Sequence, residues 1–264
     1  MNNSLNGKIA IVTGGAMGNG KGIVKKFLEA GATVVVIDYS EKLNDMLKEF
    51  SEYKEKISAY KGDLRDKFGV NEVVNAIYEK YSKIDILVNN AGICELESFD
   101  KMSDELRDKH FDINIKGTWN ITKSVIPYMI KQNSGSIVNL SSVTGPMVAD
   151  PGESAYATTK AAIIGFTKAL SMEYAANNIR VNAIMPGYIH TPMVDGMASM
   201  SCPENPQSVI DGIAAGIPMK RLGTIEELGN LALFLASDNS SYITGQGIVI
   251  DGGSTSPETN SVGV

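Results

Sequence analysis

The sequence contains few of the residues that build metal sites and disulfide frameworks. Its 264 residues include two cysteines, Cys94 and Cys202, and two histidines, His110 and His190. The cysteines are far apart in the sequence and neither histidine has a His or Cys nearby, so we expect neither a disulfide framework nor a metal site. So little cysteine is typical of the reducing cytoplasm, which is the compartment we expect.

Basic charge and long apolar runs are also scarce. The 24 Lys and Arg residues are outnumbered by 30 Asp and Glu, which gives a net charge of −6 and no excess of basic residues for nucleic-acid phosphates. The apolar run at 33–37 is far shorter than the roughly 18 residues of a membrane helix. The first residues show neither a signal-peptide core nor twin arginines. We therefore expect no nucleic-acid partner and no membrane association.

What recurs is a short β-branched run, a turn and a segment with helical periodicity, which is typical of parallel strands joined by crossover helices. The candidate strands are 8–13, 33–37, 57–61, 86–89, 136–140, 180–185 and 247–250. The candidate helices are 20–29, 41–52, 67–81, 103–132, 155–177 and 225–236. The strands are continuously apolar, so we expect helices on both faces of the sheet. The sequence predicts one α/β domain over 1–264, a doubly wound Rossmann-type fold with a mostly parallel seven-stranded sheet.

One irregular segment, about 191–222, interrupts this alternation. It has no Lys or Arg between Thr191 and Pro218, so it offers no clamp for a phosphate or a carboxylate. Its larger apolar residues include Met193, Met197, Met200, Ile210, Ile213, Ile217 and Met219. We interpret the segment as a mobile apolar lid over the substrate.

A glycine-rich turn, Thr13-Gly14-Gly15-Ala16-Met17-Gly18-Asn19-Gly20, follows the first strand and precedes a helix. Such a turn lets backbone N–H groups approach a pyrophosphate at a helix N-terminus, although on its own it could also be a flexible loop. Asp38 ends the second strand, where a carboxylate accepts hydrogen bonds from the adenosine ribose and repels a 2′-phosphate. Because neither Tyr39 nor Met17 supplies a cation, the sequence predicts NAD rather than NADP.

A tyrosine and a lysine, Tyr156 and Lys160, are spaced to lie on one face of a helix. A nearby ammonium favours the phenolate, which would lower the pKa of the phenol toward neutrality and suit proton exchange with an alcohol or ketone. Taken alone, the pair more often combines a buried Tyr with a solvated Lys. Ser142, just after the strand 136–140, could hold a carbonyl oxygen beside the phenol.

Taken together, these motifs resemble the classical short-chain dehydrogenase/reductase family. The resemblance covers almost the whole chain. Its motifs are the turn at 13–20, Asn-Asn-Ala-Gly at 89–92, Asn114, Ser142, the pair Tyr156 and Lys160, and Pro186-Gly187. Two departures stand out, because Asn19 replaces the usual isoleucine and the segment from Ser142 to Tyr156 is one residue longer than usual.

The resemblance implies a set of catalytic residues. Tyr156 would be the general acid/base, and Lys160 would lower its pKa and hold the nicotinamide ribose. Ser142 would position the substrate oxygen, and Asn114 would anchor a water-linked proton path. The implied cofactor contacts are Gly14, Met17, Gly18, Asn19, Gly20, Asp38, Asp63, Leu64, Asn90, Gly92, Tyr156, Lys160, Pro186, Gly187, Ile189 and Thr191.

The sequence thus predicts an NAD-dependent oxidoreductase that transfers hydride between nicotinamide and a secondary alcohol or ketone. The lid favours an apolar substrate such as a hydroxysteroid, with a sugar or polyol as the alternative. A 3-oxoacyl thioester reductase is a further alternative, which Asp38 and the negative charge disfavour. A non-catalytic dinucleotide-sensing protein would be expected to lose Ser142, Tyr156 or Lys160. The family resemblance also implies a homotetramer paired through helices 103–132 and 155–177 and a C-terminal segment.

Overall fold

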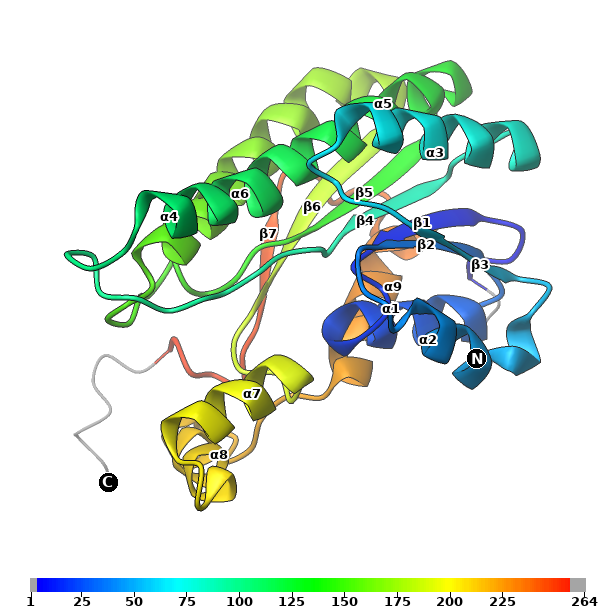
Figure 1. The fold of residues 1–264 in the computed structure, drawn as a ribbon. Coiled ribbons are helices and arrows are strands. Elements are labelled where there is room, and N and C mark those ends of the chain that lie inside the picture. The colour runs from blue at the N-terminus through cyan, green and yellow to red at the C-terminus, as the bar shows by residue number, and fades with distance from the viewer. Residues whose placement is uncertain (1–3, 257–264) are drawn as a thin grey trace.

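Seven parallel strands form a single sheet in the order β3-β2-β1-β4-β5-β6-β7 (Figure 1). The computed structural model describes residues 4–256. The strands are β1 (Ile9–Thr13), β2 (Thr33–Asp38), β3 (Ile57–Lys61), β4 (Ile86–Asn89), β5 (Gly135–Leu140), β6 (Ile179–Pro186) and β7 (Gly247–Ile250). The predicted Rossmann-like α/β fold is confirmed, and every strand pair in the sheet is parallel.

Helices cover both faces of this sheet, as the apolar strands predicted (Figure 1). One face carries α1 (Gly18–Glu29), α2 (Leu43–Glu49) and α9 (Ile225–Ala236), which share a core with residues of β1, β2 and β6. The other face carries α3 (Lys67–Tyr81), α5 (Thr118–Gln132) and α6 (Ser154–Tyr174) over a second core. None of the helices in residues 4–256 has the length and apolarity needed to cross a membrane.

Strand order reverses between β1 and β4, which lie side by side in the middle of the sheet. From β1 the chain builds outward through β2 to β3, and it then returns to build the other half from β4 to β7. In open parallel sheets, ligands bind in the crevice outside the carboxyl ends of the strands at such a reversal. The topology therefore places a candidate site beyond Thr13 and Asn89, the last residues of these two strands.

Two of the predicted helices differ in detail from the structure. The single helix predicted over 103–132 is divided into α4 (Asp104–His110), a π-helical segment (Phe111–Gly117) and α5. The helix predicted over 41–52 is shorter, because α2 ends at Glu49 and a 3₁₀ turn follows over Ser51–Tyr53. The π-helical segment carries Asn114, and π-bulges inside helices are frequent at functional sites.

The segment predicted as an irregular lid is largely helical, with α7 (Pro192–Ser201) and α8 (Pro206–Gly216). The two helices pack on a small core of their own, built from Val194, Ile217 and Leu222 with Met197, Ile210, Ile213 and Ala214 packed against it. Met193, Met200 and Met219 are exposed. Part of the apolar surface assigned to the substrate is thus used to hold α7 against α8.

Candidate active site

The glycine-rich turn packs tightly at the carboxyl end of β1. A Cβ on Gly20 would lie 2.1 Å from the carbonyl oxygen of Gly14, and a Cβ on Gly14 would lie 2.8 Å from Cα of Ala91. The turn leads into α1, whose N-cap residue Met17 makes no side-chain capping bond and whose first turn holds no acid. The N-terminus of α1 therefore keeps backbone N–H groups and a positive dipole for an anion, which fits the pyrophosphate of a dinucleotide.

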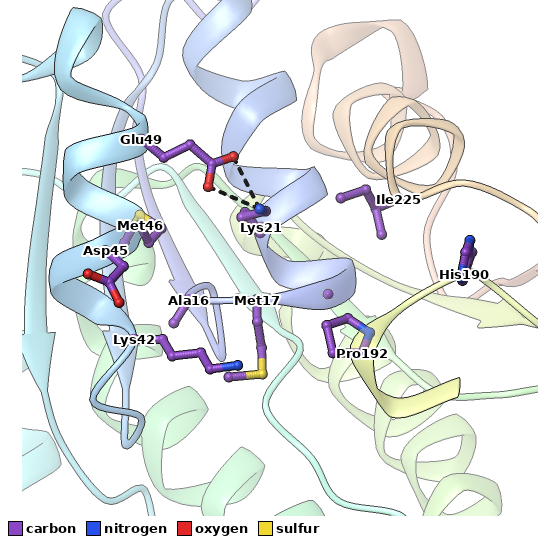
Figure 2. Close-up of a pocket in the computed structure, with 11 residues that line it drawn as sticks. Ala16, Met17, Lys21, Lys42, Asp45, Met46, Glu49, His190, Pro192 and Ile225 are labelled. Carbon is purple, nitrogen blue, oxygen red and sulfur yellow. Dashed lines mark hydrogen bonds and ion pairs between the residues drawn. The ribbon is translucent and has the colours of Figure 1, made fainter. Parts of the chain in front are cut away.

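A cavity of about 270 Å³ adjoins this helix N-terminus (Figure 2). The turn, α2, the start of α9 and the segment before α7 line it. Lys21 is paired there with Glu49 at 3.1 Å. The side chain of Lys42 reaches toward Met17 (Figure 2), and no ion pair of Lys42 is found among residues 4–256. The sequence prediction considered only Tyr39 and Met17 as sources of a cation and missed Lys42, which lies further along the loop after β2.

Asp38 ends β2 and faces the same turn. One carboxylate oxygen accepts a hydrogen bond from the N–H of Ala16 at 2.9 Å, and the other accepts one from the N–H of Ser40 at 2.8 Å. The carboxylate therefore fixes the turn against the end of β2. Each oxygen has lone pairs left for ribose hydroxyls, because an ionised carboxylate offers about four acceptor positions.

The residues assigned to the adenosine side have additional structural partners. Asp63 is held by the guanidinium of Arg65, with Nη2 and Oδ2 2.6 Å apart, and this hydrogen bonding lowers the pKa of the Asp63 carboxyl. Asn90 donates from Nδ2 to the carbonyl oxygens of Thr13 and Gly14 at 3.0 and 2.8 Å. Leu64 is buried in the second core. The side chain of Asn90 thus holds the backbone of the glycine-rich turn, and that of Leu64 packs in the core beneath the site.

The residues assigned to the nicotinamide side follow β6. Thr191 is the N-cap residue of α7 and lies across from the turn, 3.6 Å from the position that a Cβ on Gly18 would take. The side chain of Ile189 is buried, so a contact with a ligand would come from its backbone. Gly187 lies against Asp251, where a Cβ would come within 2.8 Å of the Asp251 side chain.

Ser142, Tyr156 and Lys160 come together at the carboxyl end of β5 and the first turns of α6. The Lys160 ammonium is buried and donates to the carbonyl oxygen of Leu140 at 2.8 Å. Its Nζ lies 5.6 Å from the centre of the Tyr156 ring. The Ser142 side chain is buried, accepts the N–H of Thr144 at 3.1 Å and donates to the carbonyl oxygen of Pro186 at 3.5 Å. Its hydroxyl also acts to lower the pKa of the Tyr156 phenol.

Desolvation controls the protonation of this group. Burial raises the pKa of the Tyr156 phenol, and the hydrogen bond with Ser142 opposes that shift only in part. Burial also lowers the pKa of Lys160 to about 8. The expectation that Lys160 would lower the pKa of Tyr156 is therefore not met by the protein residues alone, because burial raises the pKa of the phenol and Lys160 is not among the groups that lower it.

Cys94 lies near the same group. Burial raises the pKa of its thiol to about 11, so it is a neutral thiol at pH 7 and a poor nucleophile.

His190 lies at the rim of the cavity, with Nε2 2.9 Å from Oδ1 of Asp195. No group of three His, Cys, Asp or Glu residues within 4–256 is arranged to hold a metal ion.

The family described as enoyl-(acyl carrier protein) reductase matches residues 14–255. Oxidoreductase UcpA of Escherichia coli (strain K12) is 53% identical over 98% of this chain and 99% of its own length. The 3-oxoacyl-[acyl-carrier-protein] reductase FabG of Thermotoga maritima is 44% identical over 94% of this chain and 98% of its own length.

Two solved structures extend the comparison. The ligand-free aldohexose dehydrogenase of Thermoplasma acidophilum has a TM-score of 0.90 at 31% identity, covering 100% of this chain and 99% of that chain. A structure of ElxO with NADP bound has a TM-score of 0.86 at 34% identity, covering 95% and 99%.

The chain belongs to the short-chain dehydrogenase/reductase family. It is therefore an oxidoreductase of small-molecule substrates, from a family that uses NAD or NADP. The match spans both the glycine-rich turn and the residues grouped around Tyr156, so it applies to the whole candidate site.

Asn19, the departure from the family turn, has a side-chain oxygen that is buried without a hydrogen-bond partner in residues 4–256. Leaving such a group unsatisfied costs about 1–3 kcal/mol. We expect Asn19→Leu, which is close in shape, to raise the free energy of unfolding by about 1 kcal/mol. Urea unfolding measures this change. Titration of the protein fluorescence with NADH should show unchanged affinity, and a tenfold weaker affinity would instead identify the Asn19 amide as a cofactor ligand.

Proposed function

We propose that the protein is an NAD-dependent dehydrogenase or reductase that acts on a secondary alcohol or its ketone. The observation that carries this proposal is the grouping of Ser142, Tyr156 and Lys160 beside the glycine-rich turn. The cofactor supplies hydride transfer when bound. Gly14, Gly18, Gly20 and the N-terminus of α1 would hold its diphosphate, and Asp38 would hold its adenosine ribose.

The Tyr156 hydroxyl exchanges a proton with the substrate oxygen in this proposal, and the Ser142 hydroxyl orients that oxygen. The raised pKa of Tyr156 keeps the phenol protonated at neutral pH, ready to protonate a developing alkoxide during ketone reduction. In the oxidation direction the phenol must first lose its proton. Lys160 supports the phenol and the nicotinamide ribose, and Asn114 holds the surrounding backbone.

We expect Tyr156→Phe to lower kcat by about 100-fold or more, because it removes the transferable proton and keeps the ring. The substrate for this assay comes from a panel of sterols, polyols, sugars and short-chain alcohols, screened by absorbance of reduced nicotinamide. Binding of NADH should survive the change. Near wild-type turnover in the variant would show that another group carries the proton.

NAD is the proposed cofactor, and Asp38 is the residue that supports it. Lys42 would instead favour NADP, because its side chain reaches the turn and is available to an anionic phosphate (Figure 2). A charge held about 4 Å from a phosphate contributes about 1 to 4 kcal/mol, depending on exposure. Asp38 is held in place by two backbone N–H groups, whereas Lys42 is an exposed side chain. The fixed charge is the one that we expect to dominate.

We expect kcat/KM to favour NAD over NADP by roughly 10-fold or more. Asp38→Ala should narrow this ratio by removing the repulsion of a 2′-phosphate. Lys42→Ala is the matched variant and should widen the ratio, mainly by weakening NADP. Equal use of the two cofactors by the wild-type protein would overturn the assignment of NAD.

The proposed substrate is apolar, of hydroxysteroid type, because Met193, Met200 and Met219 leave apolar surface exposed on and beside the lid helices. A sugar is the second candidate, favoured by the similarity to the aldohexose dehydrogenase. A 3-oxoacyl thioester is also a candidate, favoured by the 44% identity to FabG. The alternative of a non-catalytic dinucleotide sensor is disfavoured because Ser142, Tyr156 and Lys160 are all in place.

The free thiols of Cys94 and Cys202 support the cytoplasm as the proposed compartment.

A homotetramer is proposed from the exposed apolar side chains on two surfaces. Trp119 of α5 is 53% exposed and lies against Phe166 of α6, with ring centres 5.2 Å apart. Met172, also on α6, is exposed as well. Phe234 on α9 and Tyr242 before β7 are exposed on the second surface. Exposed apolar patches of this kind mark interfaces.

Light scattering should return a mass near four times the 28.3 kDa of one chain. Trp119→Asp should reduce the assembly to a dimer by placing a charge in one interface. Phe68→Asp should leave the tetramer intact, because the exposed Phe68 lies on α3, outside both proposed interfaces. A monomer mass for the wild-type protein at micromolar concentration would refute the proposal.

A further inference from the structure

The carboxamide of Asn114 is held by three hydrogen bonds to the protein. Its Oδ1 accepts the N–H of Ile93 at 2.9 Å, and its Nδ2 donates to the carbonyl oxygen of Ile93 at 3.0 Å and to Oγ1 of Thr159 at 3.0 Å. Both amide hydrogens are thus used, and the side chain is 2% exposed. Asn114 therefore acts in this structure as a strut between the segment after β4, the π-helical segment and α6.

Thr159 is the α6 end of this strut. Its hydroxyl donates its single proton to the carbonyl oxygen of Tyr156 at 2.8 Å, which leaves its lone pairs to accept the amide of Asn114. Thr159 is fully buried, so no water competes for either bond. The hydroxyl therefore joins Asn114 to the backbone of the helical turn that separates Tyr156 from Lys160.

Lys160 is close to the other end of the same amide. A Cβ on Gly92 would lie 3.1 Å from Oδ1 of Asn114 and 3.5 Å from Nζ of Lys160, so both polar groups lie against one point of the backbone. A shift of the Asn114 side chain would therefore move the backbone at Gly92, which lies beside the Lys160 ammonium. Because the ammonium is buried and donates to Leu140, it has little room to adjust.

We propose that Thr159 is a positioning residue, whose hydroxyl fixes Asn114 and thereby sets the placement of Lys160 relative to Tyr156. The proposal rests on the function proposed above. It assigns no contact of Thr159 with substrate or cofactor, so the residue acts only through the geometry of its neighbours. A misplacement of reacting groups by about 1 Å can cost as much as 100-fold in rate.

The chain offers two matched controls on the same helix. Thr167 is also buried, accepts the amide of Asn139 at 2.9 Å and donates to the carbonyl oxygen of Ile163 at 2.8 Å, so it repeats the bonding of Thr159 away from the site. Thr158 is exposed and its hydroxyl bonds to the carbonyl oxygen of Ser154. Thr167 therefore controls for the stability lost with a buried Asn–Thr hydrogen bond. Thr158 controls for the replacement of a helical threonine by valine.

The test compares T159V, T167V and T158V in the full-length protein. We expect T159V to lower kcat by about 10-fold or more, with a smaller change in KM and in the dissociation constant for NADH. T167V should lose similar stability in urea unfolding and keep kcat within about twofold, and T158V should resemble the wild type. Thr159→Ser, which restores the hydroxyl, should recover most of kcat.

Equal kcat for T159V and T167V would overturn the proposal, because the bond would then be structural only. Should T159V fail to fold, T159A compared with T167A gives the same contrast with a smaller side chain. Tyr156→Phe in the same assay separates the two levels of inference. If that variant is inactive while T159V is fully active, only the role of Thr159 fails. If Tyr156→Phe is fully active, the proposed function fails.

Discussion

The two halves of the sheet meet where β1 and β4 lie side by side, and the side chains of Thr13 and Asn90 hold that junction. The Thr13 hydroxyl accepts the N–H groups of Asn90 and Ala91 at 3.0 and 3.1 Å and lies 3.3 Å from the carbonyl oxygen of Val88. Asn90 in turn donates to the backbone of Thr13 and Gly14. The glycine-rich turn belongs to one half and the catalytic group to the other. This reciprocal bonding therefore fixes the proposed dinucleotide site relative to the proposed proton-transfer site.

Burial is the second constraint, and it explains the electrostatics of the site. Lys160 is 6% exposed, and desolvation lowers its pKa to about 8 while raising that of Tyr156. A helix-borne Tyr and Lys at this spacing on a protein surface would both keep ordinary pKa values. Here the packing of α6 on the sheet buries Lys160 and half-buries Tyr156. The protonation of the pair consequently depends on how the surrounding backbone holds them.

The sequence predicted what depends on short-range pattern. Strand positions followed from continuous apolar runs. The grouping of Ser142 with Tyr156 and Lys160 followed from their helical spacing, the strand-end serine and the resemblance to the short-chain dehydrogenase/reductase family. The interruption of the helix over 103–132 was not predictable in this way, because the π-helical turn depends on bonds between Asn114 and the distant Ile93 and Thr159. Lys42 was missed for a related reason, since its reach toward Met17 depends on the path of the loop after β2.

Hydrogen bonds from buried Asn side chains to Thr hydroxyls join the second half of the sheet to the helices that cover it. Asn89 of β4 donates to Oγ1 of Thr122 on α5 and to Oδ1 of Asn139 on β5, and Asn139 donates to Thr167 on α6. A misregistered helix would leave these buried amides without partners, at a cost of about 1–3 kcal/mol each. Apolar packing alone tolerates small slips along a helix, whereas a directional amide bond does not. Thr159 and Asn114 form the same kind of bond at the end of α6 that carries the proposed catalytic residues. A slip of α6 by one turn would move Tyr156 and Lys160 together away from Ser142, which follows β5.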